Sequence, residues 1–421
     1  MEEKQNKINR RNFLRTIGAV GLGSVVASNR MRAGPNEPNA AEKEQKPKYP
    51  QVPRRRLGKT GAQVPCLALG GDFNLVDNQV ILREALKWGV SYWDTAHWYA
   101  RGNSELGIGK FLAKNPQIRK ELFIVTKASG AENAQDVEER LQTSLQRMNT
   151  GYIDLYFGVH MLSDPAQLTG ELKQWAESAK KRKLIRFFGF STHKNMAQCL
   201  AATSKLDWID AIMLMYNFRL MQDPEIQAAV ELCHKADIGL IAMKVQGHGQ
   251  KVPWADTRCD LETEEDKKLV KHFLERGFTG GQAKIKVVLE DEKFSSACVM
   301  MENVAILTSN AAAVLDKTEL TEADMAAFKK YAAATCSGYC AGCAHICDSA
   351  LPDTPYVSDI MRYLMYYNSY GDKNRARELF AQIPGNVRNK LLSTDYSPAE
   401  AHCPQRMPIG KLVAEAVGKL A

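Results

Sequence analysis

Residues 89–99 read GVSYWDTAHWY, a stretch that joins an apolar run directly to an aspartate and then to a tyrosine. The run GVSYW has the aromatic and β-branched composition of a buried strand. A carboxylate at the end of such a strand costs free energy unless an opposite charge or hydrogen-bond donors compensate it. Asp94 therefore predicts a partner that another part of the chain must supply.

Short apolar runs of the same kind recur along the chain, and helical patterns such as 136–148 and 224–236 separate them. The eight runs cover 64–71, 89–96, 122–128, 152–160, 185–193, 211–217, 239–245 and 295–301. Strands that alternate with helices pair in parallel, because each return crossing needs a helix. Eight such units predict an α/β fold, a closed (β/α)8 TIM barrel, and a doubly wound open sheet is the alternative.

Polar side chains stand at the ends of three successive predicted strands: Asp94 with Tyr99 just beyond it, then Lys127, then His160. The carboxyl ends of the strands form the mouth where such barrels carry their catalytic groups. We expect Lys127 to pair with Asp94 and to lower the pKa of Tyr99 toward neutrality. Tyr99 would then act as a general acid on a carbonyl oxygen that His160 orients. Taken singly, each residue also has an ordinary structural role.

Residues 53–320 resemble the aldo-keto reductase superfamily. The stretch RRRLGKTGAQVPCLALGG at 54–71 is similar to the opening hairpin and first strand of that family. WDTAHWYARGNSELGIGKFL at 93–112 is similar to its Asp-Thr-Ala, Tyr and Ser-Glu pattern, and VTKAS, DLYFGVH and FFGFSTH follow in the family order.

The resemblance implies a catalytic tetrad and a reaction. The tetrad would consist of Asp94, Tyr99, Lys127 and His160. The reaction would interconvert a carbonyl and an alcohol, in a small molecule such as a sugar, by hydride transfer with a nicotinamide. Ser191 matches the family residue that binds the nicotinamide carboxamide.

Three positions depart from the family pattern. Met213 stands where the family has a glutamine that holds the carboxamide. Met300 and Ile306 stand at the basic positions that hold the 2'-phosphate of NADP, and Asn310 is the retained half of a Glu-Asn pair. Since charge-assisted contacts to the phosphate are lost, we expect NAD(H) or NADP(H) without the usual selectivity. The alternative is a barrel that has lost nicotinamide and serves as a carbohydrate-binding or scaffold protein.

A cysteine-rich segment over 331–421 follows the barrel, which we expect to span 53–330. Its five cysteines are Cys336, Cys340, Cys343, Cys347 and Cys403. The segment resembles a reduced form of the helical, ferredoxin-like module that some aldo-keto reductases carry, which implies one [4Fe–4S] cluster. On this resemblance Cys403 completes the set that begins with Cys336, Cys340 and Cys343, and Cys347 is the alternative fourth ligand. Zinc and disulfide bonds remain open. The apolar stripe of the helix near 357–370 is expected to pack this module onto the barrel.

The first 33 residues have the order of a twin-arginine export signal. Arg10 and Arg11 precede Phe13 and Leu14, and a weakly apolar run follows. Residues 34–52 are expected to form a linker. The signal predicts a periplasmic location. A cluster there is compatible with a redox partner. The sequence does not determine the oligomeric state.

The net charge of +8 is concentrated in the first 56 residues, so the body of the chain is close to neutral. A nucleic acid is therefore not expected as a partner. No apolar run reaches the roughly 20 residues that a membrane-spanning helix needs.

Overall fold

The computed structural model of the protein describes residues 49–247 and 264–421. The expected export signal and most of the expected linker lie outside the described residues, so both stay predictions. Within the described ranges, no helix combines the length and the apolar character needed to cross a membrane.

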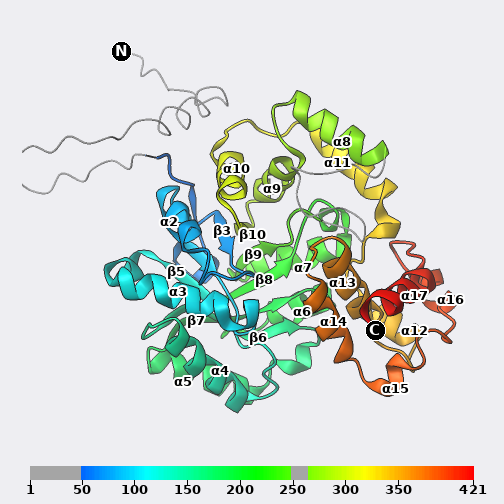
Figure 1. Ribbon diagram of the computed structural model, residues 1–421, viewed down its shortest axis with the longest axis horizontal. Helices are drawn as coiled ribbons and strands as arrows, with labels where there is room; N and C mark the ends of the chain where they lie inside the picture. The colour runs from blue at the N-terminus through cyan, green and yellow to red at the C-terminus, as the bar shows by residue number, and fades with distance from the viewer. Residues whose placement is uncertain (1–48, 248–263) are drawn as a thin grey trace, which may run out of the picture.

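Eight parallel strands close into a barrel (Figure 1). The strands are β3 (Leu67–Gly70), β4 (Tyr92–Asp94), β5 (Phe123–Lys127), β6 (Ile153–Leu162), β7 (Ile185–Thr192), β8 (Ala211–Met215), β9 (Gly239–Met243) and β10 (Phe294–Met300). Each strand pairs with the next one in the sequence, and β10 closes the ring by pairing with β3. The predicted (β/α)8 barrel is therefore confirmed, and the open sheet is excluded.

An outer ring of helices covers the strands on their outward faces (Figure 1). These helices are α2 (Gln79–Lys87), α3 (Asn103–Lys114), α4 (Ala134–Arg147), α5 (Gly170–Lys181), α6 (Met196–Thr203), α7 (Pro224–Lys235), α8 (Glu264–Glu275), α9 (Gly280–Glu290), α10 (Val304–Leu315) and α11 (Glu322–Ala334). Several of them begin where the sequence supplies a polar cap. The side chains of Asn133, Asp223 and Thr279 accept hydrogen bonds from backbone N–H groups of the first turns of α4, α7 and α9.

A two-stranded antiparallel hairpin precedes the barrel. It consists of β1 (Arg54–Arg56) and β2 (Gln63–Pro65). Leu57 lies in the connection between these two strands. It is fully buried in the same apolar cluster as Tyr92 and Val125 from the barrel strands. The hairpin therefore closes the end of the barrel opposite the carboxyl ends of the strands.

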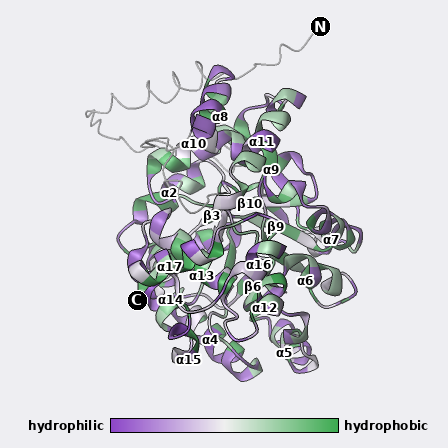
Figure 2. Cartoon of the chain, turned by 90° about the vertical axis from the view of Figure 1, so that its right-hand side faces the viewer, coloured by the Kyte–Doolittle hydropathy of each residue, from purple (hydrophilic) through white to green (hydrophobic). Residues whose placement is uncertain are grey.

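The C-terminal segment forms a helical module with a core of its own. Its helices are α12 (Ala344–Ala350), α13 (Val357–Asn368), α14 (Lys373–Ala381), α15 (Gly385–Arg388), α16 (Ser397–His402) and α17 (Ile409–Leu420). The apolar core of the barrel continues as far as Ala341, and the second core begins at Cys347. Figures 1 and 2 show the module against one end of the barrel, on the side of α6.

The apolar stripe of α13 belongs to this second core, which corrects the expectation that it packs the module onto the barrel. The helix contacts α14 and α17. Its buried apolar residues are Val357, Ile360, Met361 and Leu364. The helix also reaches the barrel: Asp359 pairs with Lys194 at 3.0 Å, and Met361 and Met365 line a cavity together with His193 and Met215 of the barrel. Most of the apolar stripe is nevertheless buried within the module.

Candidate active site

Asp94 and Lys127 are the last residues of β4 and β5, and they form a buried ion pair. Lys127 Nζ donates to Asp94 Oδ1 at 2.6 Å and to the carbonyl oxygen of Thr95 at 2.7 Å. The two side chains are only 1% and 3% exposed. Burial raises the pKa of Asp94, and the charge of Lys127 opposes that shift. The ion pair therefore supplies the partner that the carboxylate at the end of β4 requires.

Tyr99 follows β4 at the start of a strained turn, η2 (Tyr99–Gly102). Ala100, Arg101 and Gly102 have φ angles of 49°, 57° and 90°. Non-glycine residues in this left-handed region cost about 1 kcal/mol each, and such strain is often found at functional sites. The turn leads directly into α3, so it fixes the position of Tyr99 at the mouth of the barrel.

The pKa of Tyr99 is raised well above its ordinary value, which contradicts the expected lowering. Burial is the largest cause, and the charges of Asp72 and Asp94 add to it, while Arg375 opposes them. Lys127 Nζ lies 4.7 Å from the centre of the Tyr99 ring, and it donates to Asp94 and Thr95. Tyr99 therefore keeps its proton at neutral pH, which suits a proton donor and opposes a role as base.

His160 is aimed by irregularities in β6. The register of β6 against β7 shifts on both sides of His160, and Met161 has a φ of 75°. Such bulges re-aim side chains next to active sites. The Nδ1 atom of His160 lies 2.7 Å from Ser129 Oγ, which leaves Nε2 as the nitrogen available to a substrate. The rings of His160 and Tyr99 lie 6.1 Å apart, edge to face.

Burial and nearby cations hold the pKa of His160 well below its ordinary value. The cations that act on it are Lys127, Arg375, Arg362 and Lys244. The imidazole is therefore neutral at physiological pH and can donate one hydrogen bond from a ring nitrogen. With Ser129 Oγ donating to His160 Nδ1, the ring proton is on Nε2, and Tyr99 and His160 then present two neutral donors to one space.

That space is a cavity of about 990 Å³, including the solvent at its opening. Barrel residues in its lining include Asp72, Asp94, Tyr99 and His160. The module also lines it, through Tyr366, Tyr370, Asp372 and Arg375. Arg375 Nη1 lies 3.0 Å from Asp72 Oδ1, and its guanidinium lies 5.6 Å from the centre of the Tyr99 ring. The module therefore completes the cavity rather than standing apart from it.

Sequence reasoning missed the contribution of the module to this cavity. A signal was present, because Tyr366 and Tyr370 stand four residues apart at the end of the predicted helix, and Arg375 follows in the next one. Cys298 also lines the cavity. Burial raises the pKa of its thiol well above the ordinary value, so it is not a nucleophile at neutral pH.

The residues expected to bind a nicotinamide fit that group in part. Ser191 is 1% exposed, and its Oγ accepts a hydrogen bond from the Met161 N–H at 3.2 Å. Asn310 is 4% exposed, and its Nδ2 has no partner among the described residues, as expected of a donor that a ligand would satisfy. Met213 and Met300 line the cavity and supply neither an amide nor a charge. The donors suit a nicotinamide cofactor, whereas the cations for a 2'-phosphate are missing from the family positions.

Four of the five C-terminal cysteines are electrostatic neighbours. Burial, together with the neighbouring thiols, Cys403 included, raises the pKa values of Cys340 and Cys347 to about 12 and that of Cys343 to about 11. Cys336, in η6 (Cys336–Gly338), acts instead on Arg219. The described cysteines are all free thiols. Within 49–247 and 264–421, however, no group of three or more His, Cys, Asp or Glu is arranged to hold a metal ion.

Comparison with known proteins places the chain among reductases of one family. The sequence profile of the Aldo/keto reductase family matches residues 67–333. An aldo-keto reductase of Gibberella moniliformis is 27% identical over 226 residues, which are 51% of this chain and 64% of that protein. An aldo-keto reductase of Schizosaccharomyces pombe, named with NADP(+), is 27% identical over 222 residues, 47% of this chain and 62% of that protein. The chain thus spans just under two thirds of the length of these relatives.

Solved structures show the same fold. An aldo-keto reductase of Bacillus halodurans in its holo form superposes with a TM-score of 0.53 at 21% identity, covering 67% of this chain and 96% of that one. A thermostable aldo-keto reductase solved with the inhibitor epalrestat superposes with a TM-score of 0.52 at 24% identity, covering 66% and 99%. At these identities the likeness concerns the barrel fold.

Proposed function

The chain belongs to the aldo/keto reductase family, and on that premise we propose that it reduces the carbonyl group of a small organic molecule. The observation that carries this proposal is the shared cavity in which a protonated Tyr99 and a neutral His160 lie beside the buried Asp94–Lys127 pair. A nicotinamide, when bound, supplies the hydride. Tyr99 donates the proton to the carbonyl oxygen, and His160 orients that oxygen by a hydrogen bond.

The charges around Tyr99 favour reduction over alcohol oxidation. A tyrosine with a raised pKa holds its proton until negative charge develops on the substrate oxygen. In the reverse direction the same residue would have to begin as a phenolate, which burial and the neighbouring carboxylates disfavour. Lys127 and Asp94 act as positioning residues, since the lysine ammonium lies over the Tyr99 ring and is held there by the carboxylate.

The choice of cofactor follows from the residues near the mouth. We propose that Ser191 and Asn310 contact the cofactor and that either NADH or NADPH is accepted. The family positions for a 2'-phosphate hold Met300 and Ile306 instead of cations. Discrimination between the two nucleotides should therefore be weak, because no charge-assisted contact rewards the extra phosphate at these positions.

The cysteine segment supports a second part of the proposal, a [4Fe–4S] cluster. Its donor set fits such a group, since four free thiols act on one another in a small helical module. On this basis the ligands are Cys340, Cys343, Cys347 and Cys403, and Cys336 is left out. When bound, such a cluster would cross-link α12 to the segment that follows α16. The thiols would have to approach one another to bind it.

Export to the periplasm and a sugar substrate complete the proposal. The order of residues in the first 33 positions supports a twin-arginine signal. Trp98 is 40% exposed beside the mouth and can stack on a sugar ring.

One observation favours a different function, a carbohydrate-binding or scaffold barrel without nicotinamide. Met213 and Met300 line the cavity where the family places polar and basic side chains. The same experiment tests both readings. NADH and NADPH are titrated separately into the anaerobically purified protein, and the quenching of tryptophan fluorescence is followed. Saturable binding supports the reductase, and absence of binding by both nucleotides supports the scaffold.

A further inference from the structure

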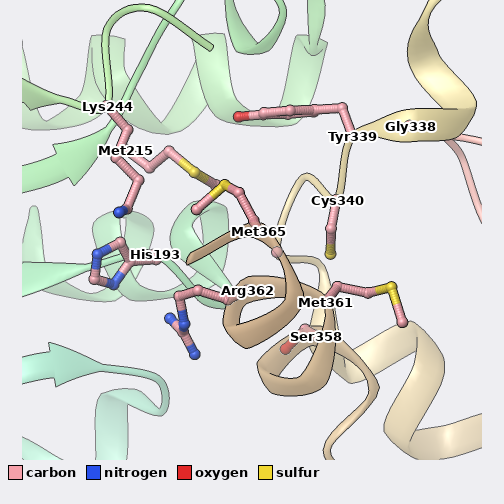
Figure 3. Close-up of a pocket in the computed structure, with 11 residues that line it drawn as sticks. His193, Met215, Lys244, Gly338, Tyr339, Cys340, Ser358, Met361, Arg362 and Met365 are labelled. Atoms are coloured by element: carbon pink, nitrogen blue, oxygen red, sulfur yellow. The ribbon is translucent and has the colours of Figure 1, made fainter. Parts of the chain in front are cut away.

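A second, smaller cavity adjoins the reaction cavity at the interface between barrel and module. Its volume is about 430 Å³ including the solvent at its opening, and no Asp or Glu is among its lining residues. It is drawn in Figure 3, where Lys244 and His193 come from the barrel and Arg362 comes from α13 of the module. Lys244 and His193 also line the reaction cavity, so the two spaces share a wall.

Lys244 is a half-buried cation whose nearest described contacts are tyrosines rather than carboxylates. Its Nζ lies 4.8 Å and 4.9 Å from the ring centres of Tyr366 and Tyr370, and 3.5 Å from the Tyr366 hydroxyl. Burial works against its charge, but the two tyrosines raise its pKa above the ordinary value. Among the described residues, none of the carboxylates pairs with it. Lys244 therefore stays charged; the described carboxylate whose charge it feels, Asp72, forms its ion pair with Arg375 instead.

His193 offers an unused hydrogen-bonding atom in the same wall. It is 8% exposed, and its Nδ1 is buried without a partner among the residues that the structure describes. Burial and the charges of Arg362 and Lys244 hold its pKa well below the ordinary value, so the ring is neutral. In Figure 3 the side chains of Lys244, His193 and Arg362 follow one another along one side of the cavity. A buried ring nitrogen without a partner costs free energy that a ligand would recover.

Arg362 extends the positive charge of this wall. Its Nη2 donates to Asp359, which also pairs with Lys194, so one carboxylate is shared between two cations. The charges of Arg362 and Lys244 also act on His160 in the reaction cavity. A wall with two cations, one neutral imidazole and no carboxylate attracts and holds an anion.

We propose that the substrate is an anionic carbonyl compound whose carboxylate binds to Lys244, His193 and Arg362. Its carbonyl group then lies toward Tyr99 and His160 in the adjoining cavity. The identity of the reacting group rests on the proposed function, whereas the anion site stands on its own residues. The module is thus part of substrate recognition, because Arg362 and both tyrosines around Lys244 belong to it.

Two aldehydes of matched shape test the proposal. 4-Carboxybenzaldehyde carries an anionic group, and methyl 4-formylbenzoate is its neutral ester. We expect Lys244→Met to lower kcat/KM for the acid by about tenfold or more, and for the ester by less than about threefold, since a charge-assisted contact is lost only with the acid. Lys235→Met, an exposed lysine of α7, is the matched control and should change neither. Lys244→Arg should restore the preference for the acid, which separates lost charge from a folding defect.

A binding measurement separates this proposal from the proposed function. In a Tyr99→Phe background, calorimetry should still show 4-carboxybenzaldehyde binding, weakened about tenfold by Lys244→Met. If binding behaves this way and the wild type reduces neither aldehyde, the reductase is wrong and the anion site stands. Equal loss for acid and ester would overturn the anion site and leave the reductase standing. If Lys244→Met weakens the binding of NADH and NADPH instead, the anion site is also overturned, because the lysine would then bind the cofactor diphosphate.

Discussion

The hydroxyl of Tyr99 is the group on which the proposed chemistry depends. We expect Tyr99→Phe to lower kcat for carbonyl reduction by about 10²-fold or more, because the proton donor is lost while the ring and its contact with Lys127 remain. Steady-state kinetics with an aromatic aldehyde measure the effect. Tyr92→Phe is the control, because the Tyr92 hydroxyl is buried in the barrel interior and has no hydrogen-bond partner among the described residues. Turnover that Tyr99→Phe leaves unchanged would remove Tyr99 from the mechanism.

The two donors also predict how reduction depends on pH. The pKa of Tyr99 is raised, so it stays protonated as pH increases through neutrality, and the pKa of His160 is lowered, so it stays neutral as pH decreases. Neither group changes its protonation between about pH 6 and pH 8. We therefore expect kcat for reduction to vary by less than about twofold across this range. A steep fall of kcat below about pH 7 would mean that His160 titrates there.

At the same scale, the sequence predicted the pairing of Asp94 with Lys127 but not the pKa of Tyr99. The pairing follows from two side chains at the ends of neighbouring parallel strands. The pKa depends on Asp72 and Arg375, which lie 303 positions apart in the chain. Their approach requires the module to sit over the barrel, and no local pattern encodes that placement.

The strands and helices of the barrel could be predicted from the sequence because the apolar runs are short and regularly spaced. The run at 122–128 became β5 at Phe123–Lys127, and the helix at 136–148 became α4 at Ala134–Arg147. The bulges in β6 that aim His160 could not be predicted, since they depend on the register with β7. The role of α13 was misjudged because its apolar stripe is buried within the module.

The helices of the module predict which cysteines bind iron. We expect Cys347→Ser to lose most of the iron and sulfide of the anaerobically purified protein, because Cys347 interacts electrostatically with Cys343, Cys403 and Cys340. Cys336→Ser is the matched variant and should retain them, since Cys336 is not among the main groups that act on the thiols of Cys340, Cys343 and Cys347. Iron and acid-labile sulfide assays with the visible absorption spectrum measure both. If Cys336→Ser loses its iron and Cys347→Ser keeps it, the ligand set is instead the one that the ferredoxin resemblance implies, with Cys336 in place of Cys347.

At the scale of the whole molecule, the module acts as a fixed wall of the reaction cavity. The ion pair between Arg375 of α14 and Asp72 joins the module to the loop after β3. Tyr366 and Tyr370 line the same cavity. If the proposed activity holds, the substrate binds between two folded units, and the activity depends on their contact.

This contact predicts opposite effects of two substitutions on catalysis. Asp72 raises the pKa of Tyr99 and Arg375 lowers it. Arg375→Gln should therefore make Tyr99 a weaker acid and lower kcat for reduction by about tenfold, which corresponds to about one pKa unit. The double variant with Asp72→Asn should recover much of that loss, as a double-mutant cycle on kcat would show.

Arg377→Gln is the control for this cycle. It lies on the same helix as Arg375, but its Nε donates to the carbonyl oxygen of Lys419 within the module. It should leave kcat unchanged. Additive losses from Asp72→Asn and Arg375→Gln would show that the ion pair does not tune Tyr99.

The most direct test of the central claim follows a labelled hydride. NADH or NADPH deuterated at C4 of the nicotinamide is mixed with the protein and 4-carboxybenzaldehyde, and the alcohol is analysed by mass spectrometry and NMR. The account predicts deuterium on the new carbinol carbon with the wild type, and none above background with Tyr99→Phe. An alcohol that forms without the label, or a wild type that yields no alcohol while both nucleotides fail to bind, would contradict it.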